Sequence, residues 1–391
     1  MRDLKLSLIT TLVIGATTTS GATTLNEALT NGKISGEFTT TYEIRDFDKD
    51  LNGYYRDSEY SVGSFALKYE TGVWNNISLT SKFRAYGTIF EDNDDSITGT
   101  GKGDATGRFH EKNGKNRTVD IEELFLSYKL DNFAITAGRQ LISTDWINKT
   151  HDAIKVDATF ADTSIEAIWS LRQGRVYSRE YFPMTKFNEG KGVYKLGITQ
   201  KFNENLSVTA YGLVMPDIKD IYGAKANINL DDTSVRVQYA KSKDKDSDDN
   251  EDIDSGVFDL KISTNIAGFS PFAGYIKVDE DADFPGYFNH DGTGEIIVPF
   301  EEGDYVYTKD AQTFYLGINK SFNNLNATLL YGQTKYDSGD DSLTMDETTL
   351  WLGYPVTNNL NANLGYTHVN EDSDSTISDY NQLNLTLTYS F

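Results

Sequence analysis

The chain has 391 residues, of which 38% are hydrophobic and 13% aromatic, and it carries a formal net charge of −23 with no cysteine. The lack of cysteine excludes disulfide scaffolds, zinc–thiolate sites and a cysteine nucleophile. The acidity argues against a nucleic-acid partner, because phosphate binding needs a basic face. The composition also excludes a helical membrane bundle, which needs repeated runs of about twenty apolar residues. Length alone favours two or three soluble domains. However, a low hydrophobic fraction combined with many aromatic residues is unusual for a packed core.

Residues 1–22 have the features of a secretory signal peptide. Arg2 and Lys5 give a basic start, an apolar stretch follows, and Ser20-Gly21-Ala22 form a small-x-small cleavage site. The alternative is a buried amphipathic helix. We expect residues 1–22 to be a signal peptide and residues 23–391 to form one domain outside the cytoplasm.

From residue 33 onward, short segments alternate between apolar and polar residues. In the last of them, Leu383, Leu385 and Leu387 alternate with Asn384, Thr386 and Thr388. This period of two is typical of strands with one apolar and one polar face. The pattern predicts about eighteen strands, near 33–45, 60–71, 76–90, 118–130, 132–140, 153–160, 164–172, 192–202, 206–216, 220–230, 233–241, 254–264, 268–278, 312–322, 325–335, 345–355, 360–369 and 380–391.

The connections between these segments alternate between short and long along the chain. Asp131-Asn132 and Asn323-Asn324 are short, whereas 91–117, 173–191 and 279–311 are long and polar. A membrane barrel has short periplasmic turns, longer extracellular loops and aromatic residues at both interfaces. We therefore predict an all-β fold, a transmembrane antiparallel up-and-down β-barrel in a Gram-negative outer membrane. The alternative is a soluble array of β-sandwiches or a β-helix, but no fixed repeat is visible.

Charged residues within the strands fall mostly on the polar face, which we expect to line a water-filled lumen. A charge facing lipid at mid-depth costs about 2–4 kcal/mol, whereas the lumen tolerates it. Arg139 and Lys320 violate the alternation, but both lie near strand ends, where their side chains can reach the interface. The predicted pore-lining residues are Lys82, Arg84, Glu123, Arg172, Lys195, Arg236 and Lys261; for each one alone, a simple solvated or paired charge is the alternative.

The segment 141–152 is a candidate constriction loop. It contains apolar anchors and lies between two clear strands, so that it can fold into the lumen and narrow it. The candidate constriction residues are Trp146, Asn148, Lys149 and His151. An ordinary surface loop is an equally good interpretation.

Residues 48–59 match the spacing of a calcium-binding loop. Asp48, Asp50, Asn52, the carbonyl of Tyr54 and Glu59 supply oxygen ligands, with Gly53 at the sharp turn. The alternative is a chance match in a loop rich in Asp and Asn. The sequence contains no recognisable catalytic motif, so we do not expect an enzyme, and no cofactor is required.

Several segments resemble a known family. They are LKLSL at 4–8, ATTLNEA at 22–28, the strand from Gly36 ending in Tyr42-Glu43-Ile44-Arg45, and Gly138-Arg139-Gln140 followed by Trp146-Ile147-Asn148. They resemble epsilonproteobacterial outer-membrane porins, including the Campylobacter major outer membrane porin, and more distantly OprD-type porins. The resemblance implies an eighteen-stranded, usually trimeric barrel that passes small hydrophilic solutes. It also implies that Tyr389-Ser390-Phe391 is read by the barrel-assembly machinery, and that Arg84, Arg172 and Arg236 act as a basic ladder for carboxylates.

The function that we expect is passive diffusion of small hydrophilic solutes and ions through an outer-membrane porin. The alternatives are a channel that prefers carboxylates or other anions, and a mainly structural or adhesive barrel. The expected partners are outer-membrane lipid and lipopolysaccharide, the assembly machinery and two further copies in a homotrimer. The sign of the ion selectivity stays open, because acidic loops and a mildly basic lumen act in opposite directions.

Overall fold

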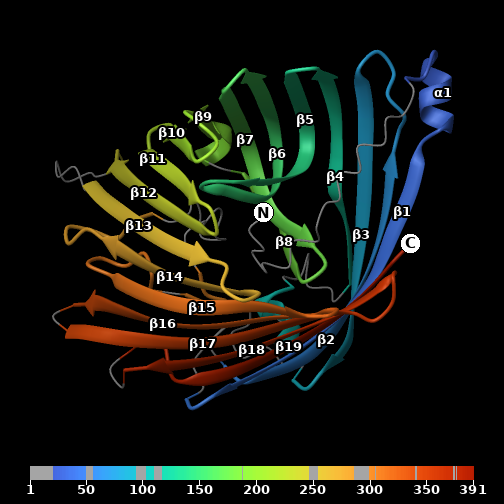
Figure 1. Ribbon diagram of the computed structural model, residues 1–391. Helices are drawn as coiled ribbons and strands as arrows, with labels where there is room; N and C mark the ends of the chain where they lie inside the picture. Colours follow the sequence, from blue (N-terminus) through green and yellow to red (C-terminus); the bar gives the residue numbers. More distant parts are fainter. Residues whose placement is uncertain are drawn as a thin grey trace.

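A computed structural model describes residues 21–49, 56–93, 103–109, 117–186, 188–245, 254–285, 299–303, 305–339, 341–372, 375 and 377–391. Within these residues, nineteen strands form one antiparallel sheet that closes into a barrel (Figure 1). All strands except β8 form the wall, which leaves eighteen, as the alternation predicts. The strands are β1 (Lys33–Phe47), β2 (Ser58–Glu70), β3 (Ile77–Glu91), β4 (Arg117–Leu130), β5 (Phe133–Thr144), β6 (Ile147–Phe160), β7 (Thr163–Tyr177), β8 (Glu180–Lys186), β9 (Val193–Lys201), β10 (Leu206–Met215), β11 (Lys219–Leu230), β12 (Thr233–Asp244), β13 (Asp254–Thr264), β14 (Phe269–Val278), β15 (Gln312–Phe322), β16 (Leu325–Ser338), β17 (Asp341–Pro355), β18 (Leu360–Glu371) and β19 (Tyr380–Ser390).

The first and last strands pair with each other and close the ring. Tyr42 of β1 lies opposite Leu385 of β19 on one side and opposite Ser61 of β2 on the other. The C-terminal residue extends this pairing, because the amides of Gly36 and Phe391 each donate to the carbonyl of the other, at 2.9 and 3.0 Å. Closure matters in hydrocarbon, since every backbone amide must find a partner within the protein.

The two faces of the wall differ in chemistry. Leu196, Ile198, Leu329 and Leu387 are between 42% and 51% exposed on the outer face. A soluble protein would not leave so large an apolar surface in water, whereas lipid covers it in a membrane barrel. Aromatic side chains belong to this outer face, where Trp169 in the middle of β7 stacks on Tyr194 near the start of β9 with ring centroids 6.2 Å apart.

One end of the barrel has the short turns and α1, the one α-helix among the described residues. Two-residue turns such as Asp131-Asn132 and Ala161-Asp162 join neighbouring strands, and Ala161 takes a φ of +49° there. The helix α1 (Leu25–Thr30) begins at a capping box, in which the amide of Glu27 donates to the hydroxyl of Thr24 at 3.1 Å. Among the described residues, no helix is long and apolar enough to cross a membrane.

At the other end, several segments turn into the barrel. The strand β8, which the sequence pattern does not predict, pairs with the last residues of β7 and lies inside the ring (Figure 1). The tips of β5 and β6, the short 3-10 helix η1 (Asp104–Gly107) and residues 299–303 and 305–311, which we call the segment 299–311, also lie here. These segments determine the geometry of the lumen.

Candidate functional site in the lumen

The first group of lumen charges lies on β1 to β4. Arg84 is 1% exposed and donates through Nε to Glu122 Oε2 at 2.8 Å, and through Nη2 to Glu37. Lys82 donates to Glu122 Oε1 at 2.7 Å. The predicted residues Lys82 and Arg84 thus lie in one ion-pair cluster, in which Arg84 is enclosed by carboxylates and holds neighbouring strands together. The third predicted residue of this wall, Glu123, lies beside the cluster, with its Oε2 3.8 Å from Lys68 Nζ.

Glu122 is a member of this cluster that strict alternation misses. The register between β3 and β4 shifts after Lys82, so that Lys82 lies opposite Glu123 while Phe83 lies opposite Ile121. This bulge leaves Glu122 and Glu123 both nearly buried, at 9% and 7% exposure. A bulge re-aims side chains in this way, and no residue type in the sequence marks its position.

The second group lies on β6, β9, β11, β12 and β13, and we call it the basic arc. Each cation of the arc has a close neighbour. Lys195 Nζ is 2.8 Å from Glu166 Oε1, and Lys155 Nζ is 3.4 Å from Glu166 Oε2. The arc consists of Lys155, Lys195, Lys225 (paired with Asp145), Arg236 (2.8 Å from Asp259) and Lys261 (5.0 Å from the ring centre of Phe272).

Arg172 is placed apart from the basic arc. It lies opposite Asp152 in the β6–β7 register, and Asp152 lies opposite Arg139 in the β5–β6 register. These three side chains share the outer face of the sheet with Ile154, so Arg172 does not line the lumen as predicted. His151, which precedes Asp152, lies on the other face, where its Nδ1 is 2.8 Å from Ser170 Oγ. The Arg172 side chain is 46% exposed, and its Nη1 is 3.8 Å from Asp152 Oδ2.

The wall from β15 to β19 is lined mainly by uncharged polar side chains. Hydroxyl groups pair across the strands, as in Thr313 with Thr334 at 2.9 Å and Thr349 with Thr367 at 3.2 Å. Gln382, Asn384 and Thr386 continue this surface on β19. Charged and neutral polar surfaces therefore face each other across the lumen.

Residues 141–152 form the two ends of a β-hairpin and not the irregular loop that we expected. The strand β5 bends at Gly138, whose φ is +128°, and a Cβ there would lie 2.3 Å from the carbonyl oxygen of Leu124. Only glycine fits this bend. Beyond it, β5 no longer pairs with β4 and continues in the hairpin with β6.

The hairpin tip reaches across to the opposite side of the barrel. Trp146 is 1% exposed, and its ring centre lies 5.3 Å from that of Phe284 and 6.3 Å from that of Tyr307. At the same tip, Asp145 pairs with Lys225 of the basic arc. The other candidates support the hairpin: Lys149 Nζ donates to Tyr177 Oη at 3.1 Å, and the Asn148 carbonyl oxygen lies 2.7 Å from His151 Nε2.

Arg108 connects three of the segments that enter the lumen. Its Nε donates to Glu43 of β1 at 2.9 Å, its Nη1 to Glu180 of β8 at 3.1 Å, and its Nη2 to Glu302 at 3.1 Å. Burial raises the pKa of Glu180, but Arg175, Lys149 and Arg108 together hold that pKa well below its usual range. Sequence patterns could not indicate this centre, because its members come from four distant segments.

The segment 299–311 is anchored by a second buried acid. The amides of Glu301, Glu302 and Gly303 donate to the carboxylate of Glu347 on β17, at 2.8, 3.3 and 3.2 Å. Glu347 is 1% exposed. Together with Arg108, and with Tyr307 beside Trp146 of the hairpin, this contact fixes the segment inside the barrel, so that the lumen is narrowed from several sides.

The calcium prediction falls largely outside the described residues. Asp50, Asn52 and Tyr54 are not described, and Glu59 accepts a hydrogen bond from Tyr42 Oη at 2.7 Å. In the described part of the chain, no group of three or more acidic or histidine side chains is arranged to hold a metal ion. Calcium binding at 48–59 stays a prediction.

The model of the Campylobacter major outer membrane protein family matches residues 1–168 of the chain. Over those residues the chain resembles this family of outer-membrane porins. This porin passes small solutes and resides in the outer membrane of a Gram-negative bacterium. No curated protein sequence matches it.

Solved structures show the same fold as this porin at low sequence identity. OccAB2 of Acinetobacter baumannii is 17% identical with a TM-score of 0.75, over 93% of this chain and 99% of that one. OccK8 (OprE) of Pseudomonas aeruginosa is 14% identical with a TM-score of 0.73, again over 93% and 99%. OpdK of P. aeruginosa, solved with vanillate, is 15% identical with a TM-score of 0.73 over the same shares.

Proposed function

We propose that the porin is a weakly charge-selective diffusion channel, in which the inward hairpin and the segment 299–311 select solutes mainly by size. The observation that carries this proposal is the hairpin tip, which crosses the lumen and contacts residues 284 and 307 and the basic arc. The passage beside the hairpin tip is lined by charged groups and neutral hydroxyl groups. Such a polar lining suits hydrated solutes.

Pairing within the basic arc supports weak selectivity over a strong preference for anions. Glu166 lies within 3.4 Å of two lysines, and the side chain of Asp259, with 0% exposure, contacts Arg236 at 2.8 Å. Each carboxylate offsets the field of its neighbouring cation, so that a passing solute meets dipoles and not an open row of positive charge.

A preference for carboxylates is the second candidate function, and the five cations of the basic arc favour it. Matched substitutions separate the two candidates. In planar bilayers under a salt gradient, Lys155→Gln with Lys225→Gln should move the reversal potential toward cation preference, and Glu166→Gln with Asp145→Asn should move it the opposite way by a similar amount. A carboxylate channel would instead lose most of its selectivity in the first variant and change little in the second.

The channel itself is tested by recording from the purified wild-type protein. Stepwise conductance is expected, and liposomes that contain the protein should swell faster with small sugars than with large ones. A mainly structural or adhesive barrel would show neither, which would contradict the proposal.

We also infer that the assembly is a homotrimer in contact with lipopolysaccharide, and that the assembly machinery recognises Phe391. In support, the Phe391 ring is 49% exposed on the outer face and lies 5.9 Å from that of Phe38. Light scattering of the detergent-solubilised protein should give three chains per particle. Deletion of Phe391 should reduce the amount of protein assembled in the membrane without changing the conductance of the protein that does assemble.

A further inference from the structure

Because β5 turns inward, residues 117–123 of β4 have no neighbouring strand on that side in the described structure. We call this gap in the wall the seam. Pairing between β4 and β5 ends at Leu124 opposite Arg139, whereas β4 continues for seven residues toward its start at Arg117. In the described structure, this part of β4 pairs only with β3. A free strand edge is costly in a membrane, since lipid cannot satisfy its amides and carbonyls.

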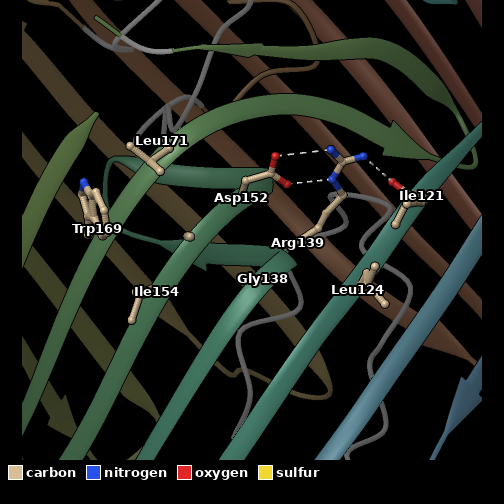
Figure 2. A pocket seen from close by; sticks show the side chains of 9 residues that line it. Ile121, Leu124, Gly138, Arg139, Asp152, Ile154, Trp169 and Leu171 are labelled. Carbon is tan, nitrogen blue, oxygen red and sulfur yellow. Dashed lines mark hydrogen bonds and ion pairs between the residues drawn. The ribbon is translucent and has the colours of Figure 1, made fainter. Parts of the chain in front are cut away.

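Arg139 closes part of this edge with its guanidinium group. Its Nη1 donates to the carbonyl of Ile121 at 3.0 Å and to Asp120 Oδ1 at 3.2 Å, and its Nε donates to Asp152 Oδ1 at 2.8 Å. Figure 2 shows Arg139 between β4 on one side and Asp152 on the other. Arg139, Asp120, Asp152 and the Ile121 carbonyl are thus occupied with one another, and the space beside them is largely apolar.

That space is a pocket of about 410 Å³, within the range of small-ligand sites. Leu124, Ile154 and Trp169 form its rim and are 41%, 38% and 37% exposed on the outer face of the wall. The pocket is lined by Ile121, Leu124, Gly138, Arg139, Asp152, Ala153, Ile154, Trp169 and Leu171 (Figure 2). It lies where the tips of β5 and β6 have turned out of the wall into the lumen, and its largely apolar lining suits a hydrocarbon chain.

The surroundings of the pocket indicate which lipid enters it. Trp169 stacks on Tyr194, an arrangement typical of the aromatic belt at a membrane interface, and Trp169 itself lines the pocket. The other lining residues of β4, β6 and β7 lie in the middle of these strands or in the parts away from the short turns. This is the outer-leaflet side, where lipid A supplies both acyl chains and phosphates. Arg172, half-exposed at 3.8 Å from Asp152, stands beside the pocket as a cation for such a phosphate.

We propose that the seam pocket binds one acyl chain of lipid A and that Arg172 contacts the phosphate of the same molecule. The chain fills the place that β5 vacates and seals the wall against lateral leakage. Binding would thus link the lipid to the inward hairpin, because Arg139, Asp152 and Gly138 form the floor of the pocket and the root of the hairpin.

Native mass spectrometry of the full-length protein, purified from its outer membrane and exchanged into mild detergent, tests the proposal. The wild type should retain lipid A. Ile154→Trp fills the pocket and should lose it, whereas Ile198→Trp, an outward isoleucine of similar exposure on β9, should retain it. Arg172→Gln should lose lipid A at a lower detergent concentration than the wild type does.

Correct folding of each variant is checked by heat-modifiable mobility on gels, and Arg172→Gln keeps the test valid if Ile154→Trp does not fold. Equal retention of lipid A in the wild type and both of these variants would overturn the proposal. A phospholipid mass in place of lipid A would overturn the choice of ligand. Loss of oligomers in Ile154→Trp with unchanged lipid would assign the pocket to a neighbouring copy of the chain, and so would also overturn it.

Discussion

At the scale of single residues, the narrowing of this barrel depends on a few positions with no substitute. Gly138 permits the bend of β5, because its φ of +128° and its approach to Leu124 leave no room for a side chain. Glu180 and Arg108 carry the charge that holds β8 in the lumen. Both kinds of position act on the same hairpin region, one through the backbone and the other through electrostatics.

Gly138→Ala should destabilise the folded barrel. The positive φ alone costs about 1–3 kcal/mol for a residue other than glycine, and the new Cβ would collide with the carbonyl oxygen of Leu124. Urea titration of the protein in lipid vesicles should show the loss. Gly87→Ala on β3 is the matched control, because a Cβ there meets nothing within 4 Å. Equal stability of the two variants would contradict the role of Gly138.

The low pKa of Glu180 predicts a pH dependence of the hairpin region. Because the folded pKa lies below the unfolded value of about 4.3, the stabilisation by Glu180 is complete above pH 5 and is lost as the pH falls through the folded pKa. Channel current should therefore stay quiet from pH 7 to about pH 5 and become noisy at lower pH. Glu180→Gln should be noisy already at pH 7, whereas Glu204→Gln, in an exposed turn, should behave as the wild type does.

At the scale of elements, the alternation of apolar and polar residues predicts the strands of the wall well and the segments inside the lumen poorly. Each wall strand has a period of two because one face meets lipid and the other meets water, so the eighteen strands could be predicted from the sequence. The strand β8 has no such constraint, since it contacts other protein segments on both sides. Its pairing with β7 is also interrupted at Pro183. The Arg108 centre and the bulge at Glu122 depend on contacts between distant segments, which periodicity does not encode.

Arg108→Met should release β8 and the segment 299–311 together. The substitution removes the cation that Glu43, Glu180 and Glu302 share, whereas Glu43 keeps Arg45 and Glu180 keeps Arg175. We therefore expect a loss of stability below the roughly 3–5 kcal/mol of a fully broken buried ion pair. Single-channel recordings should show a larger conductance and a shift toward cations. Lys191→Met removes a cation from an exposed pair with Asp217 and should leave both values unchanged. Unchanged conductance in Arg108→Met would show that these segments stay in place without Arg108.

At the scale of the whole molecule, the composition that is unusual for a globular protein follows from a closed wall between lipid and water. Apolar side chains face outward, polar side chains face a lumen, and the inward hairpin narrows that lumen while leaving a seam in the wall behind it. The size of the passage and the lipid at the seam are thus two consequences of one bend in β5.

The most direct test is the single-channel conductance of a cysteine variant before and after a bulky, charged thiol reagent, since the natural chain has no cysteine. Lys155 faces the lumen beside Glu166, and the next residue, Val156, faces the lipid. Lys155→Cys should show conductance steps that fall when the reagent is added, and Val156→Cys should show steps that do not change. An absence of steps in Lys155→Cys, or steps that the reagent leaves unaltered, would contradict a diffusion path through this lumen.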